Sequence, residues 1–182
     1  MKKLLGTSIL IGTLAVAGFG QVNARRENQQ DRIAQGVRSG QLTPGETANL
    51  ENKERAVNGE IRADKKANGG TLTPAERARI NKQQNGLSKQ IYTDKHNAAS
   101  DHFGKSEVGK REENQQDRIA QGIQSGGLNA GQTANLESRE ANINREVHAD
   151  RAANGGKLTN AEKKSINRQQ NGVSRSIYRD KH

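Results

Sequence analysis

Two loops of the sequence carry oxygen-bearing side chains at spacings that could serve a divalent cation. Calcium takes about six to eight oxygen ligands, and carboxylates are its preferred charged donors. Lys65, Lys66 and Arg151 lie in the same loops and place positive charge where the cation would sit. We therefore expect no metal and keep divalent-cation binding as an alternative, through Asp64, Asn68, Thr73 and Glu76 and the equivalent Asp150, Asn154, Thr159 and Glu162.

Residue combinations that support catalysis are missing from the sequence. There is no cysteine, no Gly-x-Ser-x-Gly string and no phosphate-binding Gly-Lys-Ser/Thr loop. The four histidines show no i, i+4 spacing of the kind that binds zinc on a helix. The paired acids Glu60 with Asp64, and Glu146 with Asp150, lie on one helix face rather than across a cleft. We therefore expect a non-enzymatic protein with no catalytic residue and no cofactor.

Helix-start and helix-stop signals predict an all-α fold. Thr43, Thr73 and Thr159 each open a capping box, and Asn129 opens a weaker one. Behind each cap, large apolar residues recur at i, i+7 and i+11, which places them on one narrow helix face. Glycine pairs at 69–70 and 155–156 end helices. These signals predict helices over residues 28–38, 44–68, 74–95, 114–124, 130–154 and 160–181.

The chain repeats itself. Residues 27–96 align with residues 113–182 at a constant offset of 86, with 44 identities in 70 positions. We divide it into a first unit (25–96), a linker (97–109) and a second unit (110–182). Each unit is predicted to form a short helix followed by a long antiparallel helical hairpin. Glu54 and Gln84 interrupt the apolar stripe, so we expect a slender assembly with a small core, whose helices could also self-associate.

Two resemblances follow from these segments. Arg-Ile-Ala-Gln-Gly at 32–36, Ala-Asn-Gly-Gly-x-Leu-Thr at 67–73 and Ile-Tyr-x-Asp-Lys-His at 91–96, with their second copies, resemble uncharacterised bacterial secreted helical-repeat proteins. That resemblance implies a secreted bacterial origin and no particular activity. The loop before the second cap resembles the back half of an EF-hand calcium loop through Gly70, Leu72, Thr73 and Glu76. Its front half departs from the motif, because Lys65, Ala67 and Gly69 stand at ligand positions.

The first residues have the pattern of a secretory signal peptide. Lys2 and Lys3 precede an uncharged apolar run over residues 4–19, and Val22-Asn23-Ala24 offers small side chains before two arginines. The run is shorter than the roughly 18–20 residues that a membrane-spanning helix needs. We predict a signal peptide over residues 1–24, a secreted or periplasmic protein, and no transmembrane segment after its removal.

The balance of charge is strongly basic. Lysine and arginine number 30 against 20 acids, which gives a formal net charge of +10. Such a charge attracts polyanions such as nucleic acid or acidic polysaccharide. Acids alternate with bases throughout, however, and base-stacking aromatic residues are scarce. We expect an exported, non-enzymatic helical-repeat protein that acts by interaction or as an envelope or extracellular structural component. Metal binding and weak polyanion binding are the alternatives, and the sequence names no partner.

Overall fold

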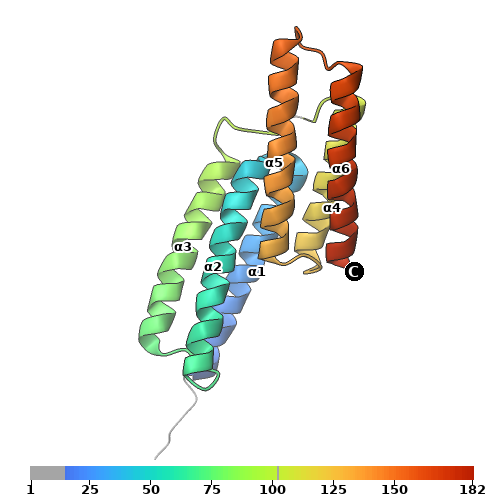
Figure 1. The fold of residues 1–182 in the computed structure, drawn as a ribbon. Helices are drawn as coiled ribbons and strands as arrows, with labels where there is room; N and C mark the ends of the chain where they lie inside the picture. Colours follow the sequence, from blue (N-terminus) through green and yellow to red (C-terminus); the bar gives the residue numbers. More distant parts are fainter. Residues whose placement is uncertain (1–14, 102) are drawn as a thin grey trace, which may run out of the picture.

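The computed structural model describes residues 15–101 and 103–182, and in these residues the chain is all-α, as predicted (Figure 1). Six helices and no strand occur there. Residues 1–14 of the predicted signal peptide lie outside the described residues, whereas residues 15–24 begin the first helix. The helices are α1 (Ala15–Ser39), α2 (Pro44–Ala67), α3 (Pro74–Lys95), α4 (Glu107–Gln124), α5 (Ala130–Ala153) and α6 (Asn160–Lys181).

The four helices that were predicted to be long, α2, α3, α5 and α6, begin where the capping signals place them. At the start of α2, the Glu46 N–H donates to the Thr43 hydroxyl oxygen (3.3 Å), and the Thr43 N–H donates to the Glu46 carboxylate (2.9 Å). The same reciprocal pair forms at the starts of α3, α5 and α6, with Asn129 and Gln132 taking these roles at α5. Because each cap satisfies backbone donors that the first turn leaves unpaired, the predicted starts of these helices are confirmed.

The predicted short helices are wrong in length. α1 begins at Ala15 instead of residue 28, and α4 begins at Glu107 instead of residue 114. The buried stripe continues backwards through Gln29, which is polar, to Val22. The Gln29 side-chain amide donates to the Gln84 carbonyl oxygen at 2.7 Å, so its burial leaves that donor satisfied. A pattern of apolar residues does not count a buried glutamine. The predicted helix therefore begins too late, at residue 28 instead of Ala15.

The first three helices and the last three lie side by side and are displaced along their length (Figure 1). The most extensive helix contact joins α2 with α5, and the next joins α1 with α4. In both pairs the helices run in opposite directions (Figure 1). Within the described residues, no helix is long and apolar enough to cross a membrane.

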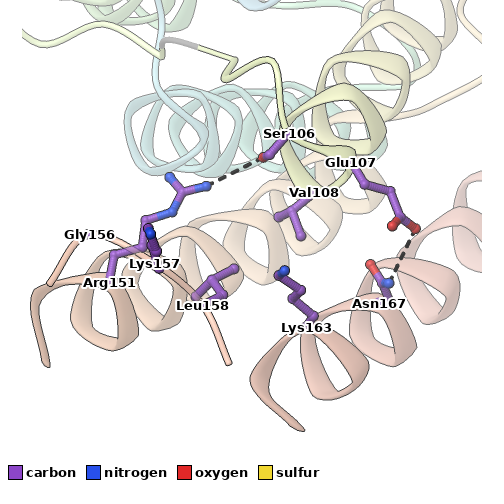
Figure 2. A pocket seen from close by; sticks show the side chains of 9 residues that line it. All are labelled: Ser106, Glu107, Val108, Arg151, Gly156, Lys157, Leu158, Lys163 and Asn167. Atoms are coloured by element: carbon purple, nitrogen blue, oxygen red, sulfur yellow. Dashed lines mark hydrogen bonds between the residues drawn. The ribbon is translucent and has the colours of Figure 1, made fainter. Parts of the chain in front are cut away.

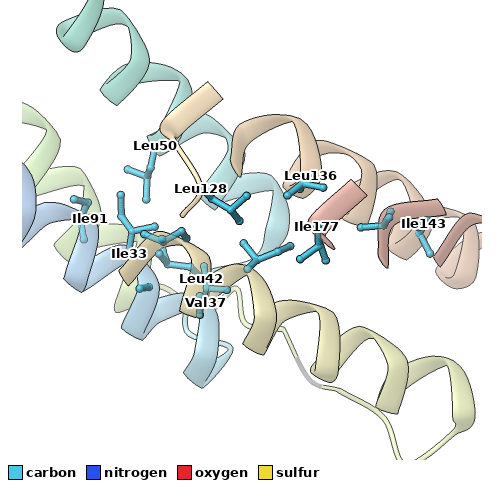
Figure 3. Packing of buried hydrophobic residues seen from close by; sticks show 14 of the residues in the cluster. Ile33, Val37, Leu42, Leu50, Ile91, Leu128, Leu136, Ile143 and Ile177 are labelled. Carbon is cyan, nitrogen blue, oxygen red and sulfur yellow. The ribbon is translucent and has the colours of Figure 1, made fainter. Parts of the chain in front are cut away.

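The main apolar core is shared between the two groups of helices. Ile33, Leu50 and Ile91 from the first group belong to the same buried cluster as Leu136 and Ile177 from the second (Figure 3). A smaller cluster at the far end of the first group contains Val22, Val57, Ile61, Leu72 and Ile80. The shared core means that the two groups stabilise each other directly rather than only through their connecting segment.

Candidate functional site

The structure brings three of the four predicted metal ligands of the first loop together, but as a helix cap. The Asn68 side-chain amide donates to both carboxylate oxygens of Glu76 at 2.9 Å. The Thr73 N–H donates to Glu76 Oε2 at 2.7 Å, and this hydrogen bond lowers the pKa of Glu76. Asp64 lies apart from them and binds Arg79, with 2.8 Å between Oδ2 and Nη2. The oxygens of Glu76 are thus already engaged with donors from its own loop.

The second loop repeats this arrangement. The Asn154 side-chain amide donates to Glu162 Oε1 at 2.8 Å, and the Thr159 N–H donates to Glu162 Oε2 at 2.7 Å. The same Asn154 amide also donates to the Asp150 backbone oxygen at 2.8 Å, and burial raises the pKa of the Asp150 carboxyl. Across residues 15–101 and 103–182, no group of three or more His, Asp or Glu side chains is arranged to hold a metal ion.

A cap and a calcium site predict different results for Thr73→Ala. We expect the substitution to lower the free energy of unfolding by about 1 kcal/mol, because the Glu76 N–H loses its acceptor. The loss should be the same with and without millimolar calcium, as measured by thermal melts monitored by circular dichroism. A calcium-dependent rise in melting temperature that Glu76→Gln abolishes together with Glu162→Gln would contradict the cap assignment.

Five buried glutamates form the most unusual feature of the interior, and sequence reasoning did not identify them as a group. They are contributed by α2, α4 and α5, and Glu54 is the one that interrupts the predicted stripe. The Gln30 amide donates to Glu51 at 3.3 Å, and the Gln116 amide donates to Glu137 at 3.1 Å. We call the group the carboxyl cluster: Glu51, Glu54, Glu112, Glu137 and Glu140.

Burial changes the charge of this cluster. It raises the pKa of Glu51, Glu112 and Glu140 to about 8 and that of Glu54 to about 7. It also raises the pKa of Glu137 well above its ordinary value. Neither carboxyl oxygen of Glu54 or of Glu140 has a hydrogen-bond partner among the described residues. Protonation therefore keeps several of these side chains uncharged near neutral pH.

A surface pocket of about 330 Å³ lies where the start of α4 meets the end of α5 and the start of α6 (Figure 2). Arg151, Lys157 and Lys163 give it three cationic groups, and Val108 and Leu158 add apolar surface. Arg151 Nη2 donates to the Ser106 hydroxyl oxygen at 3.4 Å. We call it the end pocket; it is lined by Ser106, Glu107, Val108, Arg151, Gly156, Lys157, Leu158, Lys163 and Asn167.

The end pocket has a composition that suits an anionic group rather than a reaction. The Asn167 side-chain amide donates to Glu107 Oε1 at 3.3 Å, so the single acid of the lining is held by a neighbour. Lys157 and Lys163 are exposed and available to solution. No sequence pattern marks this pocket, because its lining comes from three helices that only the fold brings together. In the sequence, Arg151 is notable only as a positive charge that opposes calcium binding.

Comparison with protein-family models, with curated proteins and with solved structures gives no match. The function must therefore be inferred from the arrangement of charge and from the end pocket. Within the described chain, five glutamates are buried, whereas every lysine and arginine is at least partly exposed. Burial thus removes five acids from the surface and leaves the basic side chains there together with the other 15 acids.

Proposed function

We propose that this chain is an exported, non-enzymatic helical-repeat protein that acts by interaction with anionic polymers. Export is supported by the signal-like pattern of the first residues. The observation that carries the choice of partner is that five of the 20 acids are buried, whereas every lysine and arginine of the described residues is at least partly exposed. Acidic polysaccharide and nucleic acid are polymer classes that present a dense row of anionic groups.

The exposed charge is more positive than the composition suggests. The chain from residue 15 onward carries 28 lysines and arginines and 20 acids, a formal excess of +8. When the five glutamates of the carboxyl cluster are protonated, 15 acids remain and the excess becomes +13. A surface of this charge attracts a polyanion over about a Debye length, roughly 8–10 Å at physiological salt.

The end pocket offers a defined place for one anionic group of such a polymer. Its three cationic side chains come from α5, from the segment that follows it and from α6; Arg151 and Lys157 lie together on one side and Lys163 lies apart from them (Figure 2). Lysine and arginine bind phosphate, sulfate and carboxylate groups through charge-assisted hydrogen bonds. The lining contains no aromatic side chain on which a base or a sugar ring could stack. The pocket would therefore recognise the polymer by its charge.

Salt dependence and matched variants test this function. We expect calorimetry to show binding of the processed protein to an acidic polysaccharide or to DNA, with an affinity that falls steeply as salt rises. Arg151→Gln with Lys157→Gln and Lys163→Gln should weaken binding more than Lys66→Gln, Lys82→Gln and Lys89→Gln, a control set of three exposed lysines. If the two sets of variants weakened binding equally, the end pocket would not be a preferred binding place for the polymer. Absence of binding to any polyanion at low salt would contradict the proposed partner.

A further inference from the structure

The first turns of α1 are part of the folded protein, starting from Val22. This residue is only 3 % exposed and is the contribution of α1 to the small cluster with Val57, Ile61, Leu72 and Ile80. Its backbone oxygen also accepts a hydrogen bond of 3.0 Å from the side-chain amide of Gln84, which is itself buried. Both the side chain and the carbonyl of Val22 therefore have structural roles.

The second group of helices has the same feature at the corresponding position. Val108, 86 residues after Val22, is buried, and its backbone oxygen accepts a 3.0 Å hydrogen bond from the side-chain amide of Gln170. One turn later, Arg111 donates to Asn171 at 2.6 Å, as Arg25 donates to Asn85. Because no leader precedes Val108 in the middle of the chain, this arrangement belongs to the fold itself.

Cleavage after Ala24 would remove Val22 from this arrangement. The residues around it would lose apolar cover, and the Gln84 amide, which is buried in the intact fold, would lose its acceptor. The apolar run that such a cleavage implies, residues 4–19, is also longer than the roughly 7–15 residues usual for the apolar part of a signal peptide.

A second possible cleavage site for a signal peptidase lies upstream of Ala24. Ala15-Val16-Ala17 places alanine at the two positions where small side chains are needed, and Gly18 follows. The uncharged run before it, residues 4–14, has a usual length. Cleavage there leaves residues 18–21 ahead of Val22 and keeps the small cluster complete.

We propose that a signal peptidase removes the leader by hydrolysing the peptide bond between Ala17 and Gly18, so that the exported protein begins at Gly18. Water is the co-reactant: its oxygen completes the new carboxylate of Ala17, and the nitrogen of Gly18 becomes the new amino terminus. The inference rests on the export that the proposed function includes. It differs from cleavage after Ala24 by seven residues, which intact mass resolves directly.

The test uses the full chain, expressed with its own first residues in a bacterium, and intact mass spectrometry of the exported fraction. We expect the unchanged chain to begin at Gly18. Ala17→Phe should block processing, because a bulky side chain replaces the small one beside the cleaved bond. The matched control Ala24→Phe, at an exposed position of α1, should be processed like the unchanged chain.

The outcomes separate the two proposals. An exported protein that begins at Arg25, or processing that Ala24→Phe blocks and Ala17→Phe does not, would overturn the Ala17–Gly18 site while leaving export intact. A chain that never leaves the cytoplasm would overturn export and the cleavage site together.

Discussion

The protein is expected to unfold at a lower temperature at pH 8.5 than at pH 5. The reason is the carboxyl cluster, whose members have pKa values raised by burial from an ordinary 4.5 to about 7 for Glu54 and about 8 for Glu51, Glu112 and Glu140. The folded state therefore binds protons that the unfolded state has released. Protons bound more tightly by the folded state stabilise it at low pH.

The raised pKa values of the carboxyl cluster determine how the stability changes with pH and over which pH range. The stabilising contribution is present in full below about pH 4.5 and is lost as the pH rises to about 8. Each titrating carboxyl changes the free energy of unfolding by up to about 1.4 kcal/mol per pH unit within that window. Glu76 and Glu162 act in the opposite sense, since their lowered pKa values make their contribution disappear in acid. Maximum stability is therefore expected near pH 5.

Thermal or urea melts from pH 4 to pH 8.5 measure this dependence. Glu140→Gln should raise stability at pH 8.5 and flatten the pH dependence, because glutamine has the shape of the protonated side chain and carries no charge. Glu113→Gln is the matched control, since Glu113 is exposed on α4. A melting temperature that stays level or rises between pH 5 and pH 8 would show that the buried glutamates do not titrate as described.

The carboxyl cluster has Glu54 in the first copy and Glu140 in the second, and their electrostatic surroundings differ. The cause is one difference between the copies, Arg26 in the first and Glu112 in the second. Arg26 lowers the pKa of Glu54 through its positive charge. The residue 86 positions later is Glu112, and its negative charge raises the pKa of Glu140. We infer that much of the pH dependence comes from the second copy, where Glu112 and Glu140 approach each other and Asp101 of the linker.

Helices α2, α3, α5 and α6 could be predicted from the sequence because their signals are local. Each cap is made by residues three apart, such as Thr73 and Glu76, and each stripe lies on a single helix. All the stripe positions behind the caps are buried as predicted, including Leu50, Ile80 and Ile166. The start of α4 also has a local signal that was missed, because the Ser106 hydroxyl oxygen accepts from the Gly109 N–H at 3.2 Å as an N-cap. The first turns of α1 and α4 are harder to recognise as part of the buried stripe, because Gln29 and Gln115 are buried through hydrogen bonds to a distant helix.

The carboxyl cluster and the end pocket depend on contacts that no sequence pattern contains. Glu54 interrupts an apolar stripe, and the sequence showed this, but two outcomes were open: the side chain could turn to solvent or stay buried. In the fold the Glu54 side chain is buried, with Arg26 of α1 as a charged neighbour. An internal repeat likewise says that two copies exist and not how they pack, so a core shared between them could not be deduced.

The shared core leads to the second large effect, expected for Leu136→Asp. Leu136 in α5 is fully buried in the cluster that also contains Leu50 of α2. A carboxylate at this position would lie among apolar side chains without a partner, which costs about 4 kcal/mol or more. Two units with separate cores would respond separately, and the first would keep its helices. Because the core is common, we expect both groups of helices to unfold together.

Circular dichroism and a urea melt distinguish these responses. Leu136→Asp should lower the helical signal by well over half at room temperature, or shift one cooperative transition to much lower urea. Asn135→Asp places the same side chain at the neighbouring exposed position of α5 and should change the free energy of unfolding by less than about 0.5 kcal/mol. If Leu136→Asp instead removed only half of the helical signal and left a second transition at the original urea concentration, the two groups would be independent folding units. The core described by Ile33, Leu50, Leu136 and Ile177 would then contribute little to the stability of the first group.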